Sequence, residues 1–227
     1  MSKQNKDKLY AALKRQILTM VLQPGESLDE ASLSKQYQLS RTPVREVLRR
    51  MAGDGYLEIA QNRGATVSPM NYKMLRDFFR TAPAIYASMA VLAAENRTSE
   101  QLSALKVSQR RFCKAVSASD PDLMAYHNND FHLIIGEMAD NQYLWPSLQR
   151  LAIDHARIAH TFYRANNPDM KARLNIARDH HDQFIDAIER RDAKKAKQLA
   201  HDHWDLSRDH IEMFVRQDPL EIDLAVA

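Results

Sequence analysis

Histidines are the residues whose types and spacing most directly suggest chemistry in this 227-residue chain. All nine lie between His127 and His210. With helical periodicity, several of them fall within apolar stripes that would face one core. These are His132, His155, His181 and His203, with Asn128 one turn before His132. Buried imidazoles need partners, and neutral imidazoles converging from separate helices are good ligands for a divalent metal. A metal site and a packed histidine core both remain open.

A second group of reactive side chains is the arginine set in LSRTPVREVLRRMAGDGYL, residues 39–57. On a helix, Thr42, Arg45 and Arg49 share one face, and the opposite stripe is apolar. Arginines on such a face displace counterions from phosphates, and a guanidinium matches the acceptor pair on a guanine edge. Because most charged helix faces are merely solvated, the interpretation depends on the neighbouring elements.

Those neighbouring elements predict a helix-turn-helix. The stripe of Leu9, Leu13, Ile17 and Met20 predicts a first helix that stops before Pro24. Asp29 is a typical N-cap for a short second helix ending near Tyr37, with Leu28 and Leu33 as a hydrophobic staple. After a tight turn, Thr42 and Pro43 predict the start of the third helix, with Thr42 as its cap.

A β-hairpin is predicted after the third helix. Alternating Leu57/Ile59 and Ala65/Val67 flank a tip at Asn62-Arg63-Gly64. Residues 1–70 therefore predict a winged helix-turn-helix of three helices and a basic β-hairpin wing, a DNA-binding domain.

Residues 71–227 differ from this first domain in charge and in pattern. Residues 1–70 hold 11 Lys+Arg against 7 Asp+Glu, and the remainder holds 21 against 22. Helices are expected at about 72–95, 98–116, 121–139, 142–164, 169–190 and 192–215, with Pro83 kinking or splitting the first of them. The fold class is mainly α, a winged helix-turn-helix followed by an all-α bundle.

Bulk composition limits the compartment. No apolar run is long enough to span a membrane, and the N-terminus lacks a secretory apolar core. Cys113 is the single cysteine, which excludes an internal disulfide and suits a reducing cytoplasm. We expect a cytoplasmic protein with no membrane partner.

The stretch from Leu22 to Val67 resembles the DNA-binding domain of the GntR family of bacterial transcriptional regulators. The resemblance is carried by Pro24-Gly25, by SRTPVRE at 40–46 and by Arg63-Gly64-Ala65. It implies base and phosphate contacts from the recognition helix and the wing, at Ser40, Arg41, Thr42, Arg45, Arg49, Arg63 and Gly64. Many relatives carry an arginine where this chain has Ala31, so one family contact is missing.

The stretches HNNDFHLIIGEMADNQYL, DHHDQFIDAIERRDAKKA and AHDHWDLSR resemble the FCD effector domain of the FadR subfamily, a helical bundle that binds a small ligand, in many members through a metal. The resemblance implies ligation of Zn, Ni or Mn by Asn128, His132, His181 and His203. Asn128 replaces the aspartate of many metal-binding members, which lowers the expected affinity because an amide brings no charge.

The same resemblance implies an anionic effector, commonly a small carboxylate. Guanidinium groups pair well with carboxylates, and Arg80 with Arg157 or His160 are candidates for a clamp. Tyr86 and Tyr163 are candidate polar groups of the pocket wall.

The predicted function is a homodimeric, ligand-responsive transcriptional regulator, a repressor released from an inverted-repeat DNA operator by its effector. Two-fold symmetry is expected because one recognition helix reads only a half-site. Alternatives are a metal-responsive regulator, an architectural DNA-binding protein without effector, and a metal-dependent enzyme fused to a DNA-binding domain. No nucleophile motif or HExxH sequence supports the enzyme, so no catalytic residue is assigned.

Overall fold

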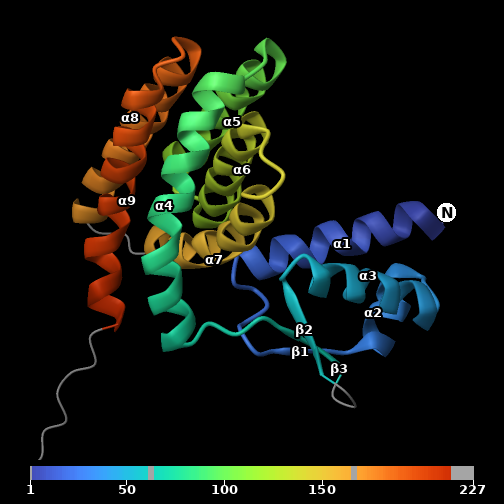
Figure 1. The fold of residues 1–227 in the computed structure, drawn as a ribbon. Coiled ribbons are helices and arrows are strands. Elements are labelled where there is room, and N and C mark those ends of the chain that lie inside the picture. The colour runs from blue at the N-terminus through green and yellow to red at the C-terminus, as the bar shows by residue number, and fades with distance from the viewer. Residues whose placement is uncertain (1, 61–63, 165–167, 216–227) are drawn as a thin grey trace, which may run out of the picture.

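The computed structural model describes residues 2–60, 64–164 and 168–215. A small winged domain comes first, and a bundle of helices follows it in the chain (Figure 1). The predicted fold class is confirmed.

The winged domain contains three helices and a three-stranded sheet. Its elements are α1 (Ser2–Leu18), β1 (Ser27–Leu28), α2 (Glu30–Tyr37), α3 (Arg41–Gly53), β2 (Leu57–Ala60) and β3 (Gly64–Val67). The predicted hairpin of β2 and β3 is antiparallel, with Leu57 opposite Val67. An additional strand, β1, pairs with β3 and gives the sheet order β1-β3-β2. Two residues are too few to show an alternating pattern, so the sequence did not reveal β1.

Local capping agrees with prediction for α2 and disagrees for α3. The Asp29 carboxylate accepts hydrogen bonds from the backbone N–H groups of Ala31 and Ser32 at 3.1 and 3.0 Å. The predicted Thr42 cap is wrong: α3 begins at Arg41, with Ser40 as its N-cap. Pro43 still lies in the first turn, where a missing N–H breaks no helical hydrogen bond.

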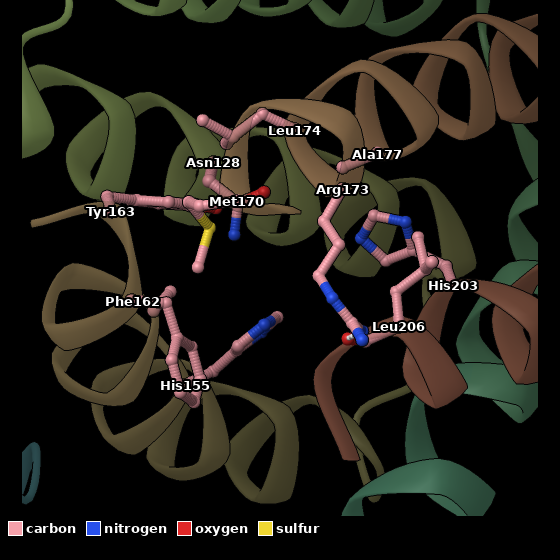
Figure 2. Close-up of a pocket in the computed structure, with 11 residues that line it drawn as sticks. Asn128, His155, Phe162, Tyr163, Met170, Arg173, Leu174, Ala177, His203 and Leu206 are labelled. Carbon is pink, nitrogen blue, oxygen red and sulfur yellow. Dashed lines mark hydrogen bonds between the residues drawn. The ribbon is translucent and has the colours of Figure 1, made fainter. Parts of the chain in front are cut away.

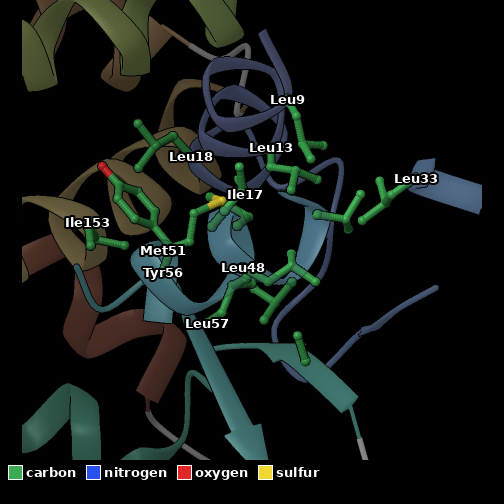
Figure 3. Packing of buried hydrophobic residues seen from close by; sticks show 14 of the residues in the cluster. Leu9, Leu13, Ile17, Leu18, Leu33, Leu48, Met51, Tyr56, Leu57 and Ile153 are labelled. Carbon is green, nitrogen blue, oxygen red and sulfur yellow. The ribbon is translucent and has the colours of Figure 1, made fainter. Parts of the chain in front are cut away.

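The core of the winged domain is built on the predicted helical stripes. Leu9, Leu13 and Ile17 of α1 pack with the apolar face of α3, but Met20 is not part of this stripe. Helix α1 ends at Leu18, and Met20 adopts a left-handed backbone with φ of 56°. Ile153 from the second domain belongs to this core and lies beside Met51 and Tyr56 (Figure 3).

The second domain consists of helices packed side by side (Figure 1). They are α4 (Tyr72–Asn96), α5 (Ser99–Ser117), α6 (Pro121–Ala139), α7 (Trp145–Tyr163), α8 (Pro168–Glu189) and α9 (Ala193–Val215). Helix α7 starts later than predicted because the Asn141 carboxamide accepts hydrogen bonds from the N–H groups of Tyr143 and Leu144 and holds a turn there. Pro83 does not split α4, which packs against α6, α7 and α9 along its length.

At Gly136, helix α6 packs closely against α7. A Cβ atom added there would lie 2.1 Å from Leu148 Cδ2 and 2.8 Å from Trp145 Cζ3. The two helices therefore meet where α6 has no side chain, and this contact fixes α7 against the bundle.

We predict that Gly136→Ala lowers the free energy of unfolding by about 1–3 kcal/mol, because the methyl group overpacks this contact. Gly53→Ala is the matched control. Its added Cβ meets nothing within 4 Å, so it should stabilise by roughly 0.4–1 kcal/mol through the unfolded chain. Urea denaturation of both variants measures the two changes, and an unaffected Gly136→Ala protein would contradict the close packing of α6 on α7.

Candidate functional site

Three predicted metal ligands meet inside the second domain. His132 comes from α6, His181 from α8 and His203 from α9. Each offers one ring nitrogen, and these three atoms lie within 4.8 Å of one another. His132 and His181 are buried, so the helical stripes do bring these imidazoles together.

Each imidazole of this histidine cluster has one buried ring nitrogen without a partner among the described residues. His132 Nε2, His181 Nε2 and His203 Nδ1 are buried and accept or donate no hydrogen bond among the described residues. The other nitrogen of His181, Nδ1, lies 3.0 Å from Gln109 Oε1. Because the Gln109 amide NH₂ donates to the Arg178 carbonyl and the Asp182 carboxylate, its Oε1 is the acceptor for His181 Nδ1–H. His181 Nε2 then carries the free lone pair that a metal ligand needs.

Burial keeps these imidazoles neutral. It lowers the pKa of His203 to about 3, and it lowers the pKa of His132 and His181 well below the ordinary histidine value. Neighbouring imidazoles add to the effect on His132 and His181. Three neutral, enclosed imidazoles with unpaired nitrogens fit a divalent metal, since deprotonated imidazole is the ligating form.

A cavity of about 60 Å³ adjoins the histidine cluster. Figure 2 shows His155 pointing into it from α7, with the Arg173 side chain reaching toward it from α8. The lining residues are Asn128, His155, Ala159, Phe162, Tyr163, Met170, Arg173, Leu174, Ala177, His203 and Leu206. Asn128, the predicted fourth ligand, is buried one turn before His132 on α6 and lines the cavity.

The candidate effector residues separate into two groups. Tyr163 lines the cavity, and the Tyr86 hydroxyl lies 2.9 Å from Nδ1 of His155, a cavity residue. Arg80 is exposed on α4 and lies outside the cavity lining. His160 also lies outside it, with Nε2 at 2.7 Å from the Asp122 carboxylate.

Arg157 has a different position from the one predicted. It is fully buried, and its Nη1 donates to the Ser68 carbonyl at 2.6 Å while Nη2 pairs with Asp154. Ser68 lies between β3 and α4, in the segment that joins the two domains. Its hydroxyl donates to the Gly55 carbonyl at 2.8 Å. Arg157 therefore ties α7 to the domain linker and does not line the cavity.

Arg173 is the cavity residue that the sequence reasoning missed. It follows Met170 by three positions and precedes Ala177 by four, so it lies beside the inward stripe of α8. That spacing could have identified it. Its Nη1 donates to the Leu206 carbonyl at 3.1 Å and its Nε to the Asp169 carboxylate at 3.2 Å, which hold the side chain at the cavity.

The predicted DNA-contacting residues share one exposed face of the winged domain. Ser40, Arg41, Thr42, Arg45 and Arg49 are all exposed at or near the start of α3. Between α3 and the wing, a hollow is lined by Arg45, Arg49 and Gly64, with the half-exposed Ile59 beside them. Arg45 Nε lies 2.8 Å from the Glu30 carboxylate of α2. Arg63 lies outside the described residues.

Arg50 belongs to a different arrangement. Its guanidinium carbon lies 4.4 Å from the centre of the Tyr10 ring, so it packs on α1 and does not join the face of α3 that carries Arg45.

In the described parts of the chain, no helix is long and apolar enough to cross a membrane.

Comparisons with known proteins agree with this architecture. Residues 5–67 match the gntR family of bacterial regulatory proteins, and residues 78–206 match the FCD domain. The HTH-type transcriptional repressor RspR of Escherichia coli K12 is 26% identical over 196 residues, which cover 86% of this chain and 83% of that protein. The galactonate operon transcriptional repressor of the same strain is 23% identical over 216 residues, covering 86% and 91%.

Solved structures show the same fold. That of E. coli McbR/YncC gives a TM-score of 0.74 at 23% identity and covers 92% of this chain and 96% of that one. A putative GntR regulator from Rhodococcus sp. RHA1 gives 0.69 at 15% identity, covering 93% and 99%. The chain belongs to the GntR family of bacterial regulatory proteins and carries an FCD domain behind its DNA-binding domain, an architecture that fits the FadR-like subfamily.

Proposed function

We propose that this protein is a ligand-responsive transcriptional repressor that acts as a homodimer on an inverted-repeat operator in the bacterial cytoplasm. One observation carries the proposal: a single helix, α7, both lines the cavity and holds the linker of the DNA-binding domain. A ligand that moves α7 therefore has a direct physical route to the DNA-binding surface.

Different faces of α7 line the cavity, pack in the core of the winged domain and hold the linker. His155, Ala159 and Phe162 line the cavity. Ile153 and Ala156 belong to the core of the winged domain. A third face, with Asp154 and Arg157, holds Ser68 of the linker. A ligand changes the spacing of the two recognition helices only if it binds one arrangement of the DNA-binding domains more tightly than the other. Helix α7 can couple the two, because it contacts both the cavity and the DNA-binding domain.

The histidine cluster would hold a divalent metal through His132, His181 and His203, with the Asn128 amide as a candidate fourth ligand. Such an ion supplies positive charge next to the cavity and favours an anionic ligand there. The residues of this chain orient that ligand and exclude water from it.

DNA recognition would use α3 in the major groove, with the wing against the adjacent backbone. The exposed Arg45 sits in the first turns of α3, where a guanidinium reaches a base edge, and Glu30 orients it. Homodimerisation places two such helices on two half-sites.

A metal-responsive regulator is the second candidate, because the unpartnered imidazole nitrogens are the feature that such a sensor needs. An enzyme fits less well. The relatives reported above bear the names of transcriptional regulators, and the described residues of the cavity lining include no carboxylate that could serve as a general base.

We predict that Arg45→Ala weakens binding to the operator by about 1–3 kcal/mol and relaxes base preference at one position of each half-site. The operator is obtained by selecting tight binders from random DNA duplexes with the wild-type protein, and the variant is then titrated against it. Arg50→Ala is the matched control, because Arg50 packs on Tyr10. If Arg45→Ala binds with unchanged affinity and preference, α3 does not read the bases.

Zinc should raise the unfolding midpoint of chelator-stripped protein, because an ion that binds the folded state alone stabilises it by mass action. The shift should disappear in His181→Ala, which removes a buried ligand, and persist in His201→Ala, which removes an exposed histidine of α9. Thermal unfolding with and without the ion measures this. An unshifted wild-type protein would eliminate zinc from the site.

Arg157→Met should loosen the linker. Removing the buried guanidinium leaves the Ser68 carbonyl unpaired, so amide hydrogens of residues 64–75 should exchange faster with solvent. The control is Arg150→Met, which removes the half-exposed partner of the same Asp154 carboxylate and should change stability by less than about 1 kcal/mol. Equal exchange in both variants would show that α7 does not hold the linker through Arg157.

A further inference from the structure

The composition of the cavity wall specifies the chemical class of the effector. We propose that the cavity binds a monocarboxylate with an apolar chain, and that it rejects polyhydroxylated acids of the same length. The inference rests on the proposed function, because it assigns the ligand of the same regulatory site.

One end of the cavity is built for an anion. Tyr86 is buried, and its hydroxyl has one acceptor among the described residues, His155 Nδ1. The phenol therefore donates to Nδ1, and the proton of the neutral imidazole lies on Nε2, on the ring that points into the cavity (Figure 2). His155 is then a hydrogen-bond donor toward a ligand.

Arg173 faces His155 across the cavity (Figure 2). Two of its nitrogens are held by the Leu206 carbonyl and Asp169, and Nη2 has no hydrogen bond to a described residue. Asp169 lies outside the lining and its side chain is two-thirds exposed, so solvent screens its charge more than it screens charges within the cavity. Among the described residues of the lining there is no acidic side chain, and the formal charge that they contribute, that of Arg173, is positive.

The remaining wall is apolar. It is formed by Ala159, Phe162, Met170, Leu174, Ala177 and Leu206. A hydroxyl group placed against this wall loses its water without gaining a partner, which lowers affinity by roughly tenfold or more for each such group. Tyr163 and Asn128 are neutral polar side chains of the lining and can satisfy one or two hydroxyls, but not the several of a sugar acid.

The cavity volume also limits the size of the ligand. One water needs roughly 10–15 Å³ of such space, so a cavity of about 60 Å³ holds a molecule of a few heavy atoms. Tyr163, Met170 and Leu174 also line a larger cleft beyond the cavity. The other residues of this cleft are Val116, Pro121 and Met124 and the polar Ser119, Arg164, Lys171 and Asn175. A longer apolar chain therefore has space to extend past these shared residues.

Isothermal titration of the full-length protein with two matched pairs of acids tests the proposal. Butanoate is compared with threonate and hexanoate with gluconate, because each pair shares its carbon chain and carboxylate and differs in hydroxyl groups. Butanoate and hexanoate should bind at least about 100-fold more tightly than their hydroxylated counterparts. Equal or tighter binding of threonate and gluconate would overturn the proposal, and so would binding of none of the four acids.

The anion-binding end of the cavity is tested separately. Arg173→Gln should weaken hexanoate binding by about tenfold or more, and Arg80→Gln, an exposed arginine outside the cavity, should leave it unchanged. Hexanamide, the neutral counterpart, should bind the wild-type protein at least about tenfold more weakly than hexanoate binds it, and this comparison needs no variant that might misfold. The anion-binding end would be overturned if Arg173→Gln left the hexanoate affinity unchanged and hexanamide bound the wild-type protein as tightly as hexanoate does.

Operator binding by the same protein preparation distinguishes a wrong ligand class from a wrong proposed function. Sequence-specific DNA binding together with the wrong acid preference would overturn the ligand class alone. Loss of sequence-specific DNA binding would overturn the proposed function itself.

Discussion

The buried guanidinium of Arg157 is the constraint on which the arrangement of the two domains depends. A charge removed from water destabilises a fold unless hydrogen bonds and an opposite charge replace the solvent. Burial lowers the pKa of Arg157, and the adjacent Asp154 carboxylate raises it. The Ser68 carbonyl, which belongs to the linker, accepts a further hydrogen bond from Nη1, whereas the buried Nε has no partner among the described residues. The linker cannot leave α7 without exposing or unpairing this charge, so the winged domain and the bundle are coupled at this point.

Close packing transmits that constraint through the bundle. Gly55, with φ of 92°, brings the end of the recognition helix against α7, where a Cβ would lie 2.5 Å from Arg150 Cδ. On the opposite side, Gly136 lets α6 approach α7. Packed interiors respond to strain by moving as units. Helix α7 is therefore clamped between the DNA-binding domain and α6, the helix that carries Asn128 and His132.

The sequence predicted those features that depend on local pattern. Helical phase alone brought His132, His181 and His203 to one core, because each lies in its own apolar stripe. Asp29 was predicted as a cap because its signal spans only the next few residues. Arg157 shows the limit of such reasoning. Its phase on α7 is compatible with a cavity wall, but one of its two acceptors lies 89 positions away, in a linker whose path only tertiary packing determines.

Asn128 lines the cavity, and it lies one helical turn before His132 of the histidine cluster. Three neutral imidazoles and an amide bring no negative charge, so a divalent ion among them would keep its full charge, whereas an aspartate would cancel part of it. A carboxylate in the adjoining cavity would then provide the charge that Asn128 lacks. A bound ion would raise the affinity for the acid by the same factor by which a bound acid raises the affinity for the ion, because linkage between two sites is reciprocal. On the proposal that this cluster binds a metal, asparagine at position 128 would weaken the site for the metal alone and would make its occupancy depend on the effector.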